Sequence, residues 1–512
     1  MDKYVNYDIG ADNDDSWTAS QSKKRRYWHM KTVLVLALLV LSFVTPNAAL
    51  CEAPSLVTAD EVMVKIKLGL PAEYDNVVIK GNLTSDQLGL TAKEILRIPF
   101  EVEMPTDEPM AANSSIVIKN STIDGLVDFN NTIFHKQVSF EGTFFVENAS
   151  FRHSVFNGDV SFSQCVFNKT GDFTGSQFKG KASFLRTCFV GIASFVSTQF
   201  GSIADFGLAT FCSVASFKDA KFTGPVGFIK TQFCDRAEFV SGQYATDATF
   251  DRTYFDGDAN FSGSLFSQVA KFNGTQFKNK TSFEGAHFTG SAQFMKPIFN
   301  STIKFNSTQF DKDTCFTHAQ FGGPAFFTSA KFNDLVEFME CDFLESSTFD
   351  RSDFRIDAVF NNATFQGPSD FLGANFRGFA DFGGSQFAHD TDFCNTSFLG
   401  PADFSRSTFN KKINFHGAQF KKNVYFESVK VNTINLTKAR YGWLFLHWDS
   451  VDHLEFDDAA YQTLINNYKR LKWLKDSYDC RSAYISEGSV KAARNHSWII
   501  NAVESIILGK SS

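Results

Sequence analysis

Two cysteines in this 512-residue chain are spaced so that a covalent bond could join them. Cys212 and Cys234 are 22 residues apart, and each directly follows a phenylalanine of a repeated pattern. If 22 residues make one turn of a stacked coil, the two cysteines lie roughly 4.8 Å apart, within the Cα range of a disulfide. We therefore expect a Cys212–Cys234 disulfide in an oxidising compartment. The odd total of nine cysteines and their irregular spacing argue against a complete disulfide framework.

Asparagines that begin an Asn-x-Ser/Thr triplet are a second group of candidate modification sites. Nine lie within the repeat, and eight of these follow a repeated aromatic by one or two residues, where we expect an exposed corner. One alternative is that Ser and Thr, being frequent in the repeat, create such triplets by composition. With an export signal present, we expect N-glycosylation of the repeat. The candidates are Asn130, Asn168, Asn273, Asn300, Asn306 and Asn395, and the other triplets begin at Asn82, Asn113, Asn120, Asn148, Asn279, Asn362, Asn435 and Asn495.

The residue types that carry catalysis or bind metals do not form a recognisable motif. The ten histidines are scattered, with no His-x-x-x-His or Cys-x-x-Cys spacing, and there is no Gly-x-x-x-x-Gly-Lys-Ser/Thr phosphate loop. Carboxylates gather at expected corners, and we interpret them as solvated turn residues; calcium binding is the alternative, but they do not recur at one phase of the repeat. The sequence thus predicts no catalytic, metal or cofactor site and no enzyme. The corner carboxylates are Asp256, Asp258, Asp311 and Asp313.

Phenylalanine recurs with a period of 11 from Phe129 to Phe426, and all 28 positions of this first series are Phe. A second series begins five residues later and is Phe at 26 of 28 positions, with Tyr244 and Val431 as the exceptions. Small residues stand two positions before the members of both series, including Cys165 and Cys341. These two series hold 54 of the 61 phenylalanines, so we interpret the aromatic excess as core. The predicted core ladder includes Phe129, Phe140, Phe151, Phe272, Phe277 and Phe426.

This period predicts a solenoid of short strands. In an extended segment a residue and the one two positions before it share a face, so each step points one Phe and one small residue inward. Polar corners, often with Gly, then turn the chain, as in the segments 173–178 and 283–288. Four steps make a square turn of 22 residues, and the 28 units make 14 turns whose ladder starts one unit early at Ile118 and Ile123.

The repeated pattern (small)-x-Phe-x-x-(small)-x-Phe resembles the pentapeptide-repeat family in an 11-residue, Phe-centred variant, as in archaeal members. The resemblance covers about 300 of the 512 residues. It implies an all-β fold, a right-handed quadrilateral parallel β-helix with short helical caps. It implies little about function, because the family includes topoisomerase binders that mimic DNA, membrane-attached proteins and many members without a known activity.

The net charge of −7 is spread so that residues 129–430 carry 27 basic and 29 acidic side chains. This balance excludes a basic stripe for phosphate binding and argues against an acidic DNA mimic. We therefore expect no nucleic-acid partner. Protein or cell-envelope components are the expected partners, and the sequence does not indicate an oligomeric state.

The segments outside the repeat predict export and two caps. Residues 1–53 form an N-terminal extension with a signal peptide, whose 12-residue apolar run 33–44 follows a basic stretch and precedes a cleavage region between Ala49 and Ala53. Met30 is an alternative start, and an uncleaved anchor in residues 31–50, which would contact the membrane, is the alternative to cleavage; Cys51 lacks the residue that a lipoprotein signal requires before it. Residues 54–112 are a lead-in with a helix over 58–69 and a strand over 76–83, and residues 113–436 are the β-helix.

Residues 437–512 are predicted to hold a terminal coil and a helical cap. An amphipathic helix from Asp457 is expected to bury Tyr461, Leu464, Ile465, Tyr468, Leu471, Leu474 and Tyr478. This stretch resembles the segment that follows the β-helix in the archaeal group, where some chains continue into a channel-like membrane module. The apolar run 498–508 is too short to span a bilayer. The leading interpretation is a non-catalytic, exported rod, secreted or at the cell surface, that acts as an envelope scaffold or binding module; the alternative is a membrane-associated accessory module that lacks its transmembrane domain.

Overall fold

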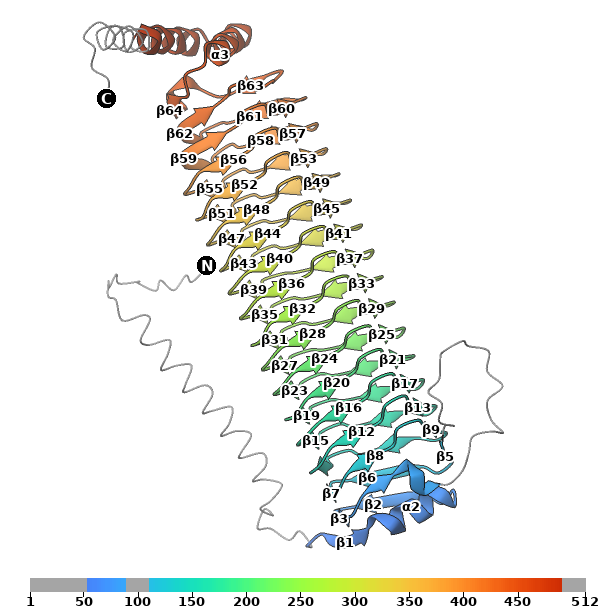
Figure 1. Ribbon diagram of the computed structural model, residues 1–512. Helices are drawn as coiled ribbons and strands as arrows, with labels where there is room; N and C mark the ends of the chain where they lie inside the picture. The colour runs from blue at the N-terminus through green and yellow to red at the C-terminus, as the bar shows by residue number, and fades with distance from the viewer. Residues whose placement is uncertain (1–52, 89–109, 490–512) are drawn as a thin grey trace, which may run out of the picture. The chain divides into compact units, whose positions relative to one another are not determined.

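The computed structural model describes residues 53–88 and 110–489. The predicted signal segment, most of the Pro-rich stretch 99–112, Asn495 and the run 498–508 lie outside these residues. The chain divides into two units, residues 1–55 and 56–512, and the following description concerns the second. Within it, the described residues form an elongated stack of strands with a helix at each end (Figure 1).

Each turn of the stack contains four short strands. One complete turn consists of β10 (Val138–Ser139), β11 (Phe144–Phe145), β12 (Ala149–Ser150) and β13 (Val155–Phe156). The next strand, β14 (Val160–Ser161), lies parallel to β10 with Val160 opposite Val138. The register therefore advances by 22 residues per turn, which confirms the predicted turn length.

The same two-residue pattern continues through β58 (Ala402–Asp403). A strand either directly precedes a first-series Phe or ends on a second-series aromatic. The first kind alternates between a 17-stranded sheet and a 32-stranded sheet, and the second kind alternates between the 32-stranded sheet and a 15-stranded sheet. The 32-stranded sheet thus covers two of the four sides. Because the 17-stranded sheet has one strand per turn, the molecule is a parallel β-solenoid of about 17 turns.

The interior is filled by phenylalanine rings stacked along the axis. All first-series Phe side chains are at most 1 % exposed, and the second-series side chains are at most 6 % exposed. Phe272 stacks on Phe250 and Phe294 at centroid distances of 4.8 and 4.9 Å, with nearly parallel planes. It meets Phe261 and Phe283 of the opposite side edge-to-face at 5.5 and 5.2 Å. Both arrangements are favourable for aromatic quadrupoles, so the ladder contributes ring-pair energy beyond apolar burial.

A left-handed residue turns the chain after every first-series Phe. The residue two positions later has a positive φ at all 28 corners, from Asn131 (φ 53°) to Ser428 (φ 57°). The amide of the third residue closes the corner, as when Thr143 N–H donates to the Phe140 carbonyl at 2.9 Å. This is a type II turn, whose third position favours glycine. Glycine occupies only eight of these corners, Gly175 and Gly285 of the predicted segments among them.

The small inward residue after each such corner often carries a hydroxyl, and that hydroxyl is satisfied within the core. Ser154 Oγ donates to the Phe129 carbonyl at 2.5 Å, and Thr187 Oγ1 donates to the Phe162 carbonyl at 2.6 Å. Cys165 and Cys341 occupy the same position and are fully buried, as predicted. A thiol or hydroxyl here adds one hydrogen bond to the turn below, so buried polarity carries little desolvation cost.

The N-terminal end is closed by the helix α2 (Ala59–Lys67), which the sequence predicted. Thr58 is its N-cap and accepts a hydrogen bond from the Glu61 amide at 3.3 Å. Its buried side chains, Val62, Met63 and Ile66, cover the first turn. The strands of this end are β1 (Ser55–Thr58), β2 (Ala72–Asp75), β3 (Val77–Lys80), β4 (Leu83–Thr84), β5 (Met110–Ala112), β6 (Ile116–Lys119), β7 (Thr122–Asp124), β8 (Val127–Asp128) and β9 (Thr132–Phe134), with a 3₁₀ helix at Ser85–Leu88.

At the C-terminal end the strands lengthen and a helix closes the stack. The last strands are β59 (Thr408–Asn414), β60 (Gln419–Phe420), β61 (Val424–Tyr425), β62 (Lys430–Asn435), β63 (Leu444–Phe445) and β64 (Val451–Leu454), with a 3₁₀ helix at Trp448–Ser450. The helix α3 (Asp458–Leu471) follows and buries Tyr461, Leu464, Ile465 and Tyr468. Among the described residues, no helix combines the length and apolar character needed to cross a bilayer.

The predicted amphipathic helix was wrong beyond Leu471. Lys472 adopts a left-handed conformation (φ 62°) that ends α3, and helical residues continue from 474 to 489 in a new direction. Trp473, at this break, stacks on the His447 ring at a centroid distance of 4.0 Å. Leu474 and Tyr478, expected to be buried, are 76 % and 75 % exposed.

Candidate functional site

Because the ladder fills the interior, chemistry on the solenoid depends on outward side chains that line up from turn to turn. Asp311 shows which residues meet. It accepts a hydrogen bond from Asn333, 22 residues later, at 2.7 Å, and its other oxygen lies 2.7 Å from His287 Nε2, 24 residues earlier. Outward side chains beside the second-series Phe are therefore neighbours when they are 22 or 24 residues apart.

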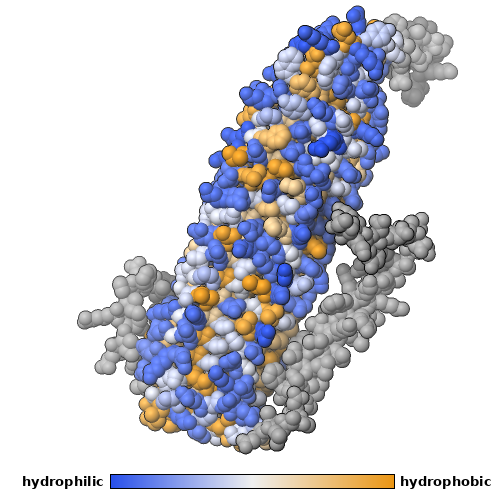
Figure 2. Space-filling model, turned by 180° about the vertical axis from the view of Figure 1, so that it is seen from behind, coloured by the Kyte–Doolittle hydropathy of each residue, from blue (hydrophilic) through white to orange (hydrophobic). Residues whose placement is uncertain are grey.

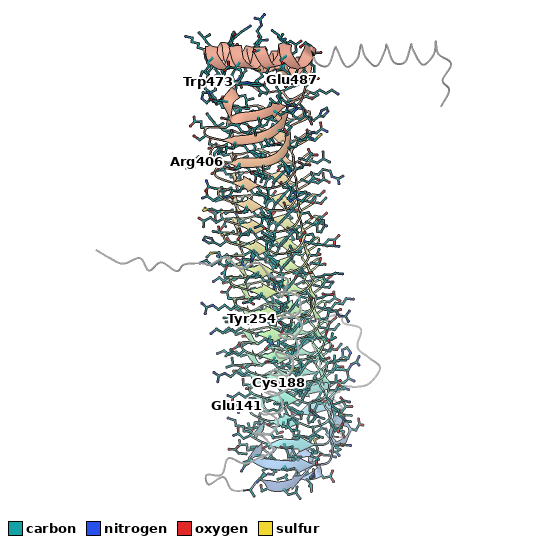
Figure 3. All side chains as sticks on the ribbon, turned by 90° about the vertical axis from the view of Figure 1, so that its left-hand side faces the viewer. Glu141, Cys188, Tyr254, Arg406, Trp473 and Glu487 are labelled. Carbon is teal, nitrogen blue, oxygen red and sulfur yellow. The ribbon has the colours of Figure 1, made fainter. Side chains whose placement is uncertain are left out.

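The same two spacings bring three cysteines together on the 32-stranded sheet. Cys212 and Cys234 follow Phe211 and Phe233, which are register partners in β23 (Thr210–Phe211) and β27 (Gln232–Phe233). Cys188 lies in β19 (Cys188–Phe189), 24 residues before Cys212. All three side chains are half-buried free thiols. We call Cys188, Cys212 and Cys234 the cysteine row, and Figure 3 shows Cys188 on the outer face of the rod.

Hydrogen bonds between the thiols run in one direction along the cysteine row. The Cys212 thiol donates to Cys188, and this outweighs burial and lowers the pKa of Cys188 below its usual value of 9.0. The same bond raises the pKa of Cys212 to about 12. Cys234 donates to Cys212, and this bond, burial and the nearby charges of Cys212 and Asp256 raise the pKa of Cys234. Cys188 is therefore the first thiol of the row to ionise.

The predicted partners Cys212 and Cys234 thus lie side by side on adjacent turns, and their disulfide stays a prediction. Sequence reasoning missed Cys188, because it precedes its Phe whereas the other two follow theirs. The 24-residue diagonal that joins these positions follows from the pleat of adjacent parallel strands. It could have been found by comparing both flanks of each ladder Phe.

The corner carboxylates differ in how they are held. Asp258 and Asp313 are exposed, as expected for solvated turn residues. Asp256 is instead ion-paired with Lys278 at 2.5 Å and accepts a hydrogen bond from Gln232 at 3.1 Å. Asp311 is held by His287, Gln309 and Asn333, and these bonds outweigh burial and lower its pKa. Two of the four carboxylates therefore belong to networks between turns.

One group of potential metal ligands was not anticipated. His447, Asp449 and Asp476 bring one ligand atom each to within 4.8 Å of one another at the C-terminal end. Asp476 already accepts a hydrogen bond from the Trp448 amide at 2.8 Å, and Asp449 lies 3.9 Å from Lys475 Nζ. These contacts tie the chain after α3 to the last turns, so the group has a structural role without any ion. It escaped notice because its members are far apart in sequence.

The predicted glycosylation sites fall into two groups. Asn300 and Asn395 are exposed on the surface, whereas the other four candidates are half-buried. The Asn130 carbonyl oxygen accepts hydrogen bonds from Ser150 and Arg152, and the Asn168 amide donates to the Val146 carbonyl at 3.1 Å. The amide nitrogen that would carry the glycan is thus freer at Asn300 and Asn395. Their modification stays a prediction, and Asn273 and Asn306 complete the half-buried group.

The balanced charge of the solenoid conceals a local excess of carboxylates. Residues 331–405 contain 13 acidic and four basic side chains. Within this band Asp370 is the register partner of Asp392, and Asp381 is the register partner of Asp403. Burial, with repulsion from the neighbouring carboxylates, raises the pKa of Asp370 and of Asp381. We call residues 331–405 the acidic band.

A continuous Phe core, four short strands per turn and a 22-residue register define a quadrilateral parallel β-solenoid. The family model described as pentapeptide repeats (9 copies) matches residues 118–166 and 250–296, both within this stack. The chain belongs to the pentapeptide-repeat family. The match does not address the archaeal variant, which stays a prediction.

Other comparisons add no relative. No curated protein and no solved structure matches the chain. The family assignment and the geometry therefore support a solenoid scaffold or binding module, and β-solenoids of this family are generally non-catalytic.

Proposed function

We propose that this chain is a non-catalytic, exported rod that acts as a scaffold or binding module at the cell surface or envelope. The observation that carries the proposal is the Phe ladder. It fills the interior of every described turn, so a partner can meet only the outer columns of side chains. Figure 2 shows polar and apolar residues mixed along one whole face of this exterior. Such a surface suits recognition along the length of the rod.

Two features favour a protein or envelope partner over a nucleic acid. The basic residues of the solenoid are balanced by acidic ones, so it lacks the positive stripe that phosphate binding needs. The acidic band instead offers a local negative field to a cationic partner surface. Absence of catalysis is supported by the ion pairs and hydrogen bonds that occupy the grouped titratable residues, Asp256, Asp311 and Asp476 among them.

Export is supported by the sequence of residues 30–53 and by the exposed triplets at Asn300 and Asn395. The test is to recover the protein from its own cells, separate soluble from membrane fractions, and determine its N-terminus and mass. A soluble form that starts near Glu52 and loses mass on enzymatic deglycosylation would support the proposal. An intact, unglycosylated form in the cytoplasm would overturn it.

The same fractionation distinguishes the second candidate, a membrane-associated accessory module. An intact N-terminus in the membrane fraction would favour anchorage through residues 31–50. Removal of residues 1–53 is the matched control, because an anchored chain should then leave the membrane fraction whereas a chain held by a partner should stay there.

A further inference from the structure

We propose that the cysteine row is a thiol–disulfide exchange site that reacts with small disulfides of the glutathione type. This inference is independent of the proposed scaffold function. It extends the predicted Cys212–Cys234 bridge, because the structure places a third thiol, Cys188, against the same central sulfur.

The first argument is the geometry of the row. Cys212 contacts both neighbours, whereas Cys188 and Cys234 influence each other through charge alone. A single metal ion needs ligands that converge on one point, but a disulfide needs only a pair. Cys212 can therefore form one bond at a time, either with Cys188 or with Cys234, and the remaining thiol lies beside that bond.

The second argument is the rigidity and exposure of the site. The three cysteines flank Phe189, Phe211 and Phe233, whose rings stack in the core at 5.0 and 4.8 Å. Stacked turns thus hold the sulfurs in line without a flexible loop. The side chains are half-buried, so a small disulfide can reach them, unlike the fully buried Cys165 and Cys341. Among the half-buried thiols, Cys188 has a lowered pKa, which increases its thiolate fraction at neutral pH.

The reaction balances in three steps. The Cys188 thiolate attacks a sulfur of the small disulfide, which forms a mixed disulfide on Cys188 and releases one small thiolate. Cys212, after losing its proton to solvent, attacks the Cys188 sulfur, forms the Cys188–Cys212 disulfide and releases the second small thiolate. The Cys234 thiolate then attacks Cys212, which forms the Cys212–Cys234 disulfide and returns Cys188 as a thiolate. The small disulfide is reduced to two thiols, and the row is oxidised by two electrons.

The test treats the reduced full-length protein with glutathione disulfide, quenches the reaction with acid at intervals, alkylates the remaining thiols and maps linkages by mass spectrometry. We expect Cys188 to react first and to lose its glutathione, leaving a disulfide from Cys212 to Cys188 or to Cys234. Cys394 is the internal control, since it is half-buried, has a raised pKa and lies beside Asp392 and Asp370. Cys188 should react on the order of tenfold faster than Cys394.

Two variants separate the steps. In Cys212→Ser the resolving thiol is absent, so glutathione should stay on Cys188. In Cys188→Ser, consumption of glutathione disulfide by the row should fall on the order of tenfold, toward the rate of Cys394. The proposal is overturned if glutathione persists on Cys188 of the natural protein without an internal linkage. It is also overturned if Cys188 reacts no faster than Cys394.

Discussion

At the scale of single residues, the alternation of inward and outward side chains decides what a substitution costs. Phe272 is fully buried between stacked rings, whereas the preceding residue, Lys271, points outward in β34 (Ala270–Lys271). We expect Phe272→Asp to disrupt the solenoid, because it removes a ring from the ladder and buries a carboxylate without a partner. Lys271→Asp is the matched control and should preserve the fold. Circular dichroism and the thermal midpoint test the pair; a native-like Phe272→Asp variant would refute the inward assignment.

Corner residues with positive φ offer a test in the opposite direction. Leu208 has a φ of 58° and is 42 % exposed, so its side chain contributes little packing to offset backbone strain. Leu208→Gly should raise the free energy of unfolding by about 0.5–1 kcal/mol. Leu265 is similarly exposed but lies in β33 (Leu265–Phe266), where Gly should cost about 1 kcal/mol. Denaturant titration of the two variants should give changes of opposite sign, and the same sign would contradict the strain argument.

Two aspartates should give opposite dependence on pH. Burial raises the pKa of Asp353, but the hydrogen bonds and charge of Arg377 outweigh it and lower the pKa below 3.8. Stability from this group is present above the unfolded pKa and is lost as the pH falls through the lower folded pKa. Asp353→Asn should therefore cost about 0.5–1 kcal/mol at pH 7 and nothing in strong acid.

Asp370 provides the opposite case within the acidic band. Its folded pKa is raised by burial and by Asp392 and Asp350. Stability from such a group is present below the unfolded pKa, near 3.8, and is lost as the pH rises through the folded pKa. Asp370→Asn should raise the free energy of unfolding by about 0.5 kcal/mol at pH 7, and the gain should shrink in acid. Unfolding titrations at pH 7 and pH 3 test both variants, and a loss from Asp370→Asn at pH 7 would show that its hydrogen bond to the Leu372 amide dominates.

At the scale of elements, the question is how the last strand avoids exposing unpaired backbone groups. Strand β63 has β61 on one side, and on its other side the Asn467 side chain of α3 takes the place of a strand. Asn467 Nδ2 donates to the Leu444 carbonyl at 2.7 Å, and Asn467 Oδ1 accepts from the Leu444 amide at 3.2 Å. The amide thereby mimics a peptide of the next turn, and the helix blocks end-to-end pairing of rods.

Replacing this amide should weaken the cap. Asn467→Ala leaves two buried backbone groups of Leu444 without partners, and we expect it to cost about 2–4 kcal/mol in cap stability. Asn466→Ala is the matched control, because Asn466 is the exposed neighbour on the same helix. Hydrogen exchange at the Leu444 amide and light scattering measure opening and association. Equal exchange in the two variants would refute the capping role.

The sequence predicted the elements that repeat and missed those that do not. The Phe period determined the strands, the 22-residue turn and the buried series, since a pattern repeated 28 times averages over local irregularity. The break at Lys472 was missed because a single left-handed lysine carries no sequence signal, and the helical spacing continues across it. Cys188 and the His447–Asp449–Asp476 group were missed for another reason: their contacts depend on diagonals between turns and on how the last helix folds back, which pattern spacing alone does not encode.

At the scale of the whole molecule, stacked turns should be removable as units. Each turn contacts mainly its neighbours, so stability is a sum of turns and interfaces. Deleting residues 283–304 removes one 22-residue register, in which Thr281 pairs with Ile303, and brings Phe305 to the position of Phe283. We expect this variant to keep its fold and thermal midpoint nearly unchanged and to be shorter by roughly 4.8 Å.

Deleting residues 284–304 instead removes only one residue fewer, yet it should be severely destabilising. The extra residue shifts the alternation, so polar side chains face the Phe core and ring stacks are interrupted at the junction. Circular dichroism, thermal unfolding and small-angle scattering compare the two deletions, which are nearly identical in composition. If both deletions behave alike, the register is not what stabilises the rod; if only the 22-residue deletion is tolerated, the turn is the unit by which this solenoid can lengthen or shorten.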